Sequence, residues 1–229
     1  MKTWADGPAA GTVNMAADVA MLEAGSHSFR TYSWWPHCLS LGRFEPEDDI
    51  DRQAAETLGI DVVRRPTGGG AILHGLDVTF CLVQPAWPGA RLIDLYTAGS
   101  DALAAGLALL GIDAVCARRV GPVTRTAACF ASAQGPDLRV GERKICGSAM
   151  RVERDACLMH GSIFLDADWE RTATLVRGAP ADALEASAVT VGELRRGTTR
   201  TEVEEALAEG VRTCLSGSHQ PGPIRCNLN

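Results

Sequence analysis

The chain has 229 residues, of which 46% are hydrophobic and 22% are charged, which suits one folded domain with a hydrophobic core. Its formal net charge of −6 argues against nucleic acid as the main partner, because phosphate binding usually requires a basic surface. No apolar run approaches the ~20 residues of a membrane span, and residues 1–11 lack the apolar stretch of a signal peptide. We therefore expect no membrane partner and a cytoplasmic location.

The apolar pattern predicts helices and strands that do not alternate regularly. Asn14 is the expected N-cap of the first helix, and Gly25 its expected end. The expected helices cover residues 15–24, 50–58, 92–110, 168–177 and 201–214. The expected strands cover residues 28–34, 38–43, 60–64, 71–74, 77–84, 112–117, 127–131, 137–140, 143–150 and 157–166. The sequence thus predicts an α+β fold, a single domain at residues 1–215 with a mixed, largely antiparallel sheet flanked by helices. Residues 216–229 are expected to be a disordered tail.

One segment, Arg-Arg-Pro-Thr-Gly-Gly-Gly-Ala-Ile-Leu-His, joins two expected strands and holds three consecutive glycines. Glycine lets the backbone adopt conformations closed to other residues and approach a ligand closely. The spacing matches neither a Walker loop nor a dinucleotide-binding fingerprint. A flexible hairpin would explain a bare triple glycine, but the flanking arginines and histidine favour a binding site. The candidate binding residues are Arg64, Arg65, Gly68, Gly69, Gly70 and His74.

Lysine is rare in this chain: of the 22 basic residues only Lys2 and Lys144 are lysine. A lysine offers a compact ammonium whose pKa can move, which a guanidinium does not. A specific role for the mid-chain lysine and its chance survival in an arginine-rich chain explain this composition equally well. In the segment Lys-Ile-Cys-Gly-Ser-Ala, Lys144 and Cys146 share one face of an expected strand. Gly147 again permits a close approach.

The eight cysteines form no Cys-x-x-Cys pair, so no zinc or other metal site is expected, and most should be small buried residues. Cys129 is the exception, because strands at 127–131 and 143–147, joined through a turn, would place it beside Lys144. A nearby ammonium lowers the pKa of a thiol and so favours the nucleophilic thiolate. His160 is expected on the same sheet, where a single histidine is more often structural than catalytic.

Taken together, these segments resemble the family of lipoate-protein ligases, biotin-protein ligases and octanoyltransferases. The resemblance rests on Arg64-Arg-x-x-Gly-Gly-Gly-Ala-x-x-His74, Lys144-Ile-x-Gly-Ser-Ala149 and Leu158-x-His-Gly161, in this order. It extends over about residues 3–196. It implies the catalytic-domain fold of that family, Lys144 as a catalytic residue, and substrate-binding roles for the glycine segment with its two arginines and histidine, for Gly147 and for His160.

The branch within the family is indicated by Cys129. LipM-type octanoyltransferases carry their nucleophile in a Cys-Phe segment shortly before the Lys-x-x-Gly motif, where this chain has Cys129 and Phe130. The glycine loop departs from that branch, since Gly70 and Gly75 stand where its members often have Arg and Asp, and Gly-Gly-Gly is the ligase-like form. We give the cysteine more weight, because a nucleophile changes the reaction whereas a loop residue tunes it.

This resemblance implies an octanoyltransferase that needs no cofactor. Acyl carrier protein would donate an octanoyl group to Cys129, and a lysine of a lipoyl domain or of the glycine-cleavage H protein would accept it. The main alternative is an ATP- and Mg-dependent lipoate or octanoate ligase that uses Lys144 and the glycine loop. A further alternative is a non-catalytic relative that binds lipoyl domains. A biotin ligase is disfavoured, since the chain lacks the Gly-Arg-Gly-Arg segment typical of those enzymes.

Overall fold

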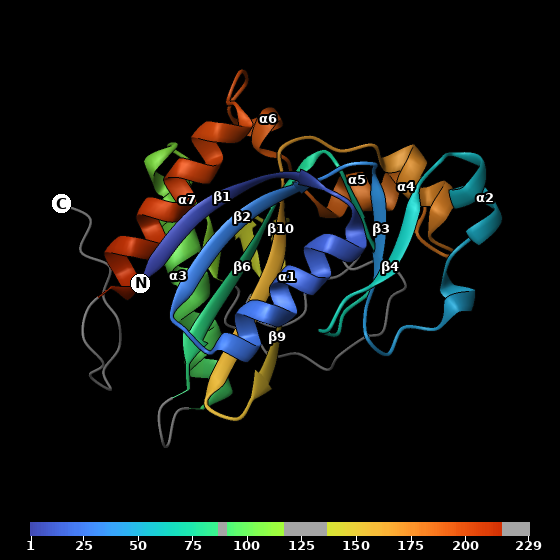
Figure 1. Ribbon diagram of the computed structural model, residues 1–229. Helices are drawn as coiled ribbons and strands as arrows, with labels where there is room; N and C mark the ends of the chain where they lie inside the picture. The colour runs from blue at the N-terminus through green and yellow to red at the C-terminus, as the bar shows by residue number, and fades with distance from the viewer. Residues whose placement is uncertain (87–90, 117–136, 217–229) are drawn as a thin grey trace.

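The computed structural model describes residues 1–86, 91–116 and 137–216, and a seven-stranded sheet forms its centre (Figure 1). The strands of this sheet are β1 (Lys2–Ala9), β2 (Ser28–Trp34), β6 (Asp77–Pro85), β7 (Val115–Cys116), β8 (Leu138–Val140), β9 (Arg143–Glu153) and β10 (Ala156–Phe164). Their order is β1-β2-β6-β10-β9-β8-β7. β1 and β2 are parallel, and all the other neighbours in this order are antiparallel.

A smaller sheet of three strands stands beside the large one. It contains β3 (Cys38–Leu41), β4 (Asp61–Arg64) and β5 (Ile72–His74) in the order β4-β3-β5. A 3₁₀ turn, η1 (Glu47–Asp49), and the short helices α2 (Arg52–Thr57), α4 (Trp169–Leu175) and α5 (Ala181–Ser187) lie around it. Leu39, Leu41 and Leu175 belong to one buried cluster, so β3 and α4 share a core that is separate from that of the large sheet.

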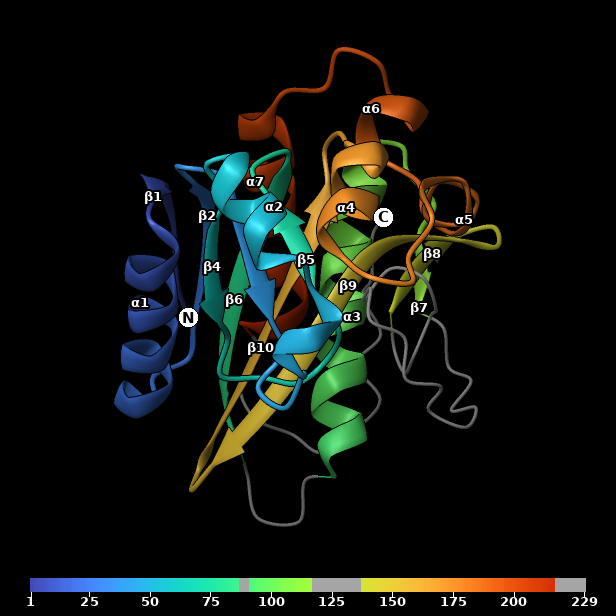
Figure 2. The ribbon, with the colours of Figure 1, turned by 90° about the vertical axis from the view of Figure 1, so that its right-hand side faces the viewer.

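Helices cover both faces of the large sheet (Figure 2). α1 (Gly11–Ala24) packs on one face, against Tyr32 and Val83. α3 (Leu92–Leu109) and α7 (Arg200–Leu215) pack on the other, against Phe29 and Phe80. Successive residues of a strand point to opposite faces, so a strand covered on both sides must be apolar throughout. In β6 eight consecutive residues, Asp77 to Gln84, are buried and five of them are apolar; the polar Asp77, Thr79 and Gln84 form buried hydrogen bonds instead.

The helices α3 and α7 approach each other through glycines. A Cβ atom on Gly106 would lie 2.7 Å from the carbonyl oxygen of Ala206, and one on Gly210 would lie 2.3 Å from the backbone nitrogen of Gly106. By length and composition α3 would also pass for a membrane span, but half of it is buried inside the protein. Its packing against the sheet and α7 makes it a core helix.

The predicted fold class is confirmed: the fold is α+β, with a mixed and largely antiparallel sheet flanked by helices. The expected N-cap is wrong, because the first helix begins at Gly11, and Asn14 inside it donates from Nδ2 to the carbonyl oxygens of Ala9 and Ser33 at 3.2 and 2.9 Å. Four of the described elements were not expected from the sequence: β1, η1, α5 and α6 (Val191–Leu194). The expected strand 127–131 and, apart from Ser216, the expected tail lie outside the described residues.

Candidate active site

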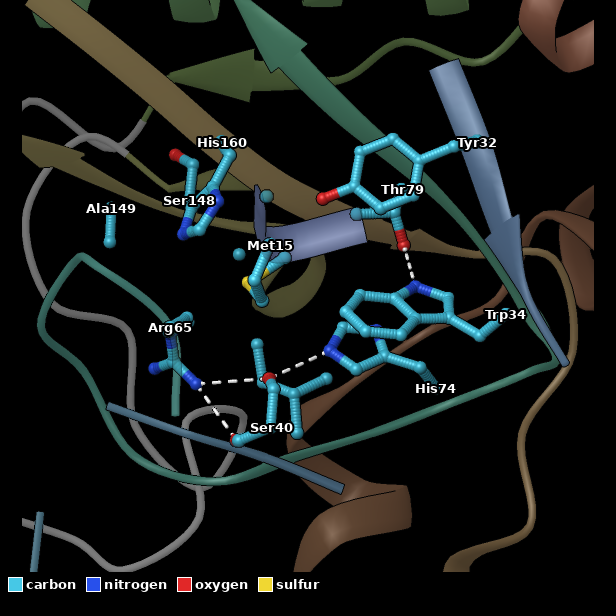
Figure 3. Close-up of a pocket in the computed structure, with 13 residues that line it drawn as sticks. Met15, Tyr32, Trp34, Ser40, Arg65, His74, Thr79, Ser148, Ala149 and His160 are labelled. Atoms are coloured by element: carbon cyan, nitrogen blue, oxygen red, sulfur yellow. Dashed lines mark hydrogen bonds between the residues drawn. The ribbon is translucent and has the colours of Figure 1, made fainter. Parts of the chain in front are cut away.

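A pocket opens where α1 and the large sheet meet the small sheet, and it holds about 350 Å³ of empty space, part of it open to solvent (Figure 3). Met15, Tyr32, Trp34, Ile72 and Ala149 give it apolar walls. Its polar lining consists of Ser40, Arg65, His74, Thr79, Ser148 and His160, and Gly147 and Gly161 complete it. Eight elements or adjoining loops therefore contribute to the pocket. An apolar chain with a polar end fits this distribution of side chains.

The glycine loop, residues 66–70, lies in the chain between the pocket residues Arg65 and Ile72, but Gly68, Gly69 and Gly70 do not themselves line the pocket. The loop is held in place by buried hydrogen bonds. Arg65 is 5% exposed, and its guanidinium donates to the carbonyl oxygens of Gly68 at 2.8 Å, Gly70 at 2.7 Å and Ser40 at 2.9 Å. The backbone N–H of Arg43 donates to the carbonyl of Thr67 at 2.7 Å. These contacts contradict the flexible-hairpin interpretation, because the carbonyls of Thr67, Gly68 and Gly70 each accept a hydrogen bond from a named donor.

A buried glutamate closes the base of this loop. Glu45 accepts the backbone N–H of Gly42 at 2.9 Å with one oxygen and that of Ala71 at 2.8 Å with the other. Burial raises the pKa of Glu45, and the two backbone hydrogen bonds and Arg65 only partly offset this effect. Gly42 must be glycine, since a Cβ there would lie 1.9 Å from the carbonyl oxygen of Gly69.

Arg64, the neighbour of Arg65, faces the other way and is not among the pocket residues. Its guanidinium donates to the carbonyl oxygens of Gly42 and Glu45 at 2.7 and 2.8 Å, and pairs with Glu47 at 2.5 Å. Adjacent residues of a strand point to opposite sides, which explains the difference between the two arginines. Arg64 thus supports the turn that carries Glu45, and a direct substrate contact by it stays a prediction.

His74 lines the pocket and is fixed on both ring nitrogens. Nδ1 lies 2.8 Å from Asp77 Oδ2, and Nε2 lies 2.8 Å from Ser40 Oγ. The ring also stacks on Trp34 with 4.2 Å between centroids. Trp34 in turn donates to Thr79 Oγ1 at 2.7 Å, so the aromatic wall and the histidine form one ordered unit, visible in Figure 3.

His160 reaches the pocket from β10 and is 4% exposed. Nδ1 lies 2.9 Å from Asp18 Oδ2, and Nε2 lies 2.5 Å from Thr67 Oγ1 in the glycine loop. Burial lowers the pKa of His160 despite the nearby Asp18 carboxylate, so the ring is neutral at pH 7. Burial by itself would raise the pKa of Asp18, but the contacts with His160 and Arg30 outweigh it and lower that pKa.

Lys144 lies at the start of β9 and is 2% exposed. Its Nζ lies 2.8 Å from Asp137 Oδ2, and that carboxylate is equally buried. Lys144 does not line the pocket, but Gly147 and Ser148 on the same strand do. Because desolvation favours a neutral amine, the paired carboxylate is what keeps this buried ammonium charged. Within the described ranges no group of three or more His, Cys, Asp or Glu side chains is arranged to hold a metal ion.

Cys129 lies outside the described residues. The expected strand 127–131 lies there too, so its pairing with residues 143–147 stays a prediction. Among the described residues, both edges of the stretch 143–146 have neighbours. β8 pairs with it on one side, where Arg139 faces Lys144, and β10 and Ala188 adjoin it on the other.

The described cysteines near the large sheet are poor nucleophiles. Burial raises the pKa of Cys38 and of Cys157 to about 12, and it raises the pKa of Cys81 well above its ordinary value. All three are closed off inside the protein and carry almost no thiolate at neutral pH. They fit the expectation that most cysteines here are small core residues.

Residues 11–212 match the family described as the lipoyl protein ligase A/B catalytic domain. The chain belongs to this family. The match spans most of the chain and includes the glycine loop, Lys144 and His160. The resemblance drawn from the sequence motifs is thereby confirmed, and the chain is an enzyme of the lipoate-attachment family.

Similar members of the lipoate-attachment family include proteins named octanoyltransferase LipM. The one from Kyrpidia tusciae is 35% identical over 98% of this chain and 91% of its own length. Those from Symbiobacterium thermophilum and Bacillus subtilis are 34% and 30% identical, over 93% and 96% of this chain and 86% and 89% of their own lengths. The similarity therefore covers nearly whole chains on both sides.

Solved structures show the same fold. A lipoate-protein ligase A bound with ATP superimposes with a TM-score of 0.78 at 22% identity, over 92% of this chain and 83% of the other. A bipartite lipoate protein ligase from Thermoplasma acidophilum, studied with its E2 lipoyl domain, gives a TM-score of 0.77 at 22% identity, over 98% and 87%. The lipoate-attachment fold of this chain is thus established.

The family motifs led to Arg65, His74, Gly147 and His160, all of which the structure brings together at one pocket. They did not lead to the carboxylates that hold these residues: Asp18, Glu45, Asp77 and Asp137. One signal was available for Asp18. It lies four residues after Asn14 on the same face of an otherwise apolar helix, and two polar residues so placed indicate a buried polar contact.

Proposed function

We propose that the chain is a cytoplasmic octanoyltransferase of lipoate synthesis, which moves an octanoyl group from acyl carrier protein to a lysine of a lipoyl domain or of the glycine-cleavage H protein. The similarity to octanoyltransferases over about nine-tenths of both chains carries this proposal. The apolar-walled pocket beside the Lys144 strand supports it.

The pocket suits a medium-length acyl chain. Met15, Trp34 and Ile72 offer apolar surface to its methylenes, and each buried methylene contributes about 0.8 kcal/mol to binding. Arg65 and Ser148 mark polar positions where the carbonyl end of the substrate can be oriented. An acyl thioester has no charged head, so binding must rest on such apolar contacts.

In the proposed reaction the Cys129 thiolate attacks the carbonyl carbon of the donor thioester. The bond between that carbon and the phosphopantetheine sulfur breaks, and the phosphopantetheine leaves as a thiol after taking up a proton. The octanoyl group is then held as a thioester on Cys129. The neutral amine of the acceptor lysine attacks this thioester next, an amide bond forms, the cysteine leaves as a thiolate, and the amine gives up one proton. The donor is already activated, so the scheme needs neither ATP nor a metal.

Lys144 has two roles in this scheme. Its ammonium lowers the pKa of the cysteine thiol and stabilises the negative charge that develops on the carbonyl oxygen. Asp137 keeps the ammonium charged and in a fixed place, which supports this assignment. No other lysine of the chain lies beyond residue 2, so no neighbouring lysine can take over.

The test is to incubate the purified chain with octanoyl carrier protein without ATP and to measure its intact mass. We expect one octanoyl adduct that is absent in Cys129→Ser and that moves to an added lipoyl domain. Cys116→Ser, at a half-buried cysteine of β7, is the matched control and should keep the adduct.

Two outcomes would replace the proposal. Octanoylation of the lipoyl domain only with ATP and free octanoate, unaffected by Cys129→Ser, would identify a ligase. Binding of the lipoyl domain with no covalent transfer under either condition would identify a non-catalytic member of the family.

A further inference from the structure

Two buried aspartate–histidine pairs, from distant parts of the chain, reach the same glycine loop. Asp18 on α1 contacts Nδ1 of His160, and Asp77 on β6 contacts Nδ1 of His74. Neither aspartate lines the pocket, and each is at most 1% exposed. The acyl-transfer scheme gives neither of them a task.

The Asp18–His160 pair contacts the glycine loop through the hydroxyl of Thr67. The ionised carboxylate of Asp18 can only accept, so Nδ1 of His160 carries the hydrogen and Nε2 is left as an acceptor. Thr67 Oγ1, 2.5 Å from Nε2, must then donate its hydroxyl hydrogen. Asp18 is itself fixed, because Arg30 donates to it at 2.8 Å and the Tyr32 hydroxyl at 2.9 Å.

The second pair acts through one more residue. In the neutral ring of His74 with the hydrogen on Nδ1, Asp77 accepts from Nδ1 and Nε2 accepts from Ser40 Oγ at 2.8 Å. Ser40 Oγ has its lone pair directed to Arg65, which can only donate and lies 3.2 Å away. The same guanidinium holds two carbonyls of the glycine loop. Every hydrogen in this chain therefore has one possible direction.

We propose that Asp18 and Asp77 are positioning residues for acyl binding. They act through these two hydrogen-bonded chains to hold the pocket residues His160, His74 and Arg65, and the glycine loop bonded to them, in the arrangement that binds the acyl chain. The inference rests on the proposed function only in naming the octanoyl group as the ligand. The chain from Asp18 fixes the loop at Thr67, and the chain from Asp77 fixes it at Gly68 and Gly70.

Thr67→Val tests the first chain with little change of shape, because valine replaces the hydroxyl with a methyl group and leaves Nε2 of His160 without a donor. Hydrogen–deuterium exchange of the unliganded chain should show faster exchange at the amides of residues 68–70. Thr67→Ser restores a hydroxyl and should restore slow exchange. Thr31→Val, at a threonine of β2 that is 2% exposed, is the matched control and should leave the loop unchanged.

The second readout is octanoate binding by calorimetry, together with the kinetics of transfer. We expect Thr67→Val to weaken octanoate binding and to raise KM for the octanoyl donor about tenfold, the loss typical of one buried hydrogen bond, with kcat nearly unchanged. Asp77→Asn should act in the same direction, because an amide in place of the carboxylate can donate to Nδ1 and so reverse the second chain.

Unchanged loop exchange and unchanged octanoate affinity in Thr67→Val would overturn the inference. A kcat that falls while KM stays constant would also overturn it, since that pattern belongs to a residue that acts on the chemical step. If the wild-type chain took up no octanoyl group from octanoyl carrier protein, the proposed function would fail, while the exchange data on the unliganded loop would still decide this inference.

Discussion

The ammonium nitrogen of Lys144 lies 2.8 Å from a carboxylate oxygen of Asp137, and both side chains are only 2% exposed. A pair so deeply buried is balanced between two large effects, the desolvation of both charges and their mutual attraction. Removing one partner therefore leaves an uncompensated charge inside the protein, whereas removing both does not.

We predict that Lys144→Met lowers the free energy of unfolding by about 3 kcal/mol, because it removes the ammonium that compensates the buried Asp137 carboxylate. The double variant with Asp137→Asn should recover a large part of this loss. Urea unfolding of the wild type, both single variants and the double variant measures the coupling. Strictly additive losses would show that the two side chains do not stabilise each other.

Lys144→Arg keeps the positive charge but is expected to lower transfer activity by at least about 100-fold. A planar guanidinium is bulkier than an ammonium and cannot place a compact charge at the same point. The measurement is the rate of octanoyl transfer to a lipoyl domain, with circular dichroism to show that the variant is folded. Retention of half the activity or more would remove Lys144 from the mechanism.

Arg65 and Arg64 provide a matched pair of neighbouring arginines. We expect Arg65→Lys to weaken octanoate binding about tenfold or more, because one ammonium cannot reach the carbonyls of Ser40, Gly68 and Gly70 together. Arg64→Lys should bind octanoate nearly as the wild type does. Calorimetry measures the affinity of both variants for octanoate. Equal losses of affinity would mean that the loop is held by positive charge alone.

The consecutive glycines should differ in their tolerance of a methyl group. Gly69 has φ of +94°, which alanine adopts only with strain, so Gly69→Ala is expected to lower the free energy of unfolding by about 1–2 kcal/mol. A Cβ on Gly68 meets nothing within 4 Å, so Gly68→Ala should change it by less than about 0.5 kcal/mol. Urea unfolding measures both. A reversed order would show that the loop takes another conformation in solution.

Stability should depend on pH through Asp77. Burial raises its pKa, but His74 and the hydroxyl of Ser162 outweigh burial and hold that pKa below its ordinary value of 3.8. In acid the unfolded chain takes up this proton first, so the stability that Asp77 contributes is present above about pH 4 and is lost as the pH falls below it. Asp77→Asn should therefore flatten the acid limb of the unfolding free energy. Asp113→Asn, at an exposed carboxylate, should not.

The sequence predicts the residues that line the pocket better than it predicts the residues that hold them in place. The motifs identify the pocket residues Arg65, His74, Gly147 and His160, because each of them lies in a short local sequence pattern. The supporting contacts join residues far apart in the chain, such as Asp18 with His160, 142 positions later, and Thr67 with the same histidine, 93 positions later. No local sequence pattern identifies such pairs. From the sequence alone, a buried aspartate therefore looks the same as an aspartate on the surface.

The missed strand β1 has a similar cause. Its sequence Lys-Thr-Trp-Ala-Asp-Gly-Pro-Ala contains glycine and proline, and most of its side chains are exposed. An edge strand with one neighbour needs no alternating apolar pattern, and proline is tolerated there. Its place is set by parallel pairing with β2, which starts 26 residues after β1 does, from Lys2 with Ser28 to Ala9 with Trp34.

The contact between α3 and α7 limits how this protein can diverge. At Gly106 and Gly210 the opposing atoms are backbone atoms, so a side chain gained at either position cannot be accommodated by a smaller residue opposite. Hydrophobic cores usually change through compensating substitutions of neighbouring side chains. Such compensation is not possible where α3 and α7 cross. The two positions should therefore remain glycine in any descendant that keeps the helix pair, and libraries designed to stabilise or diversify the enzyme should hold them fixed.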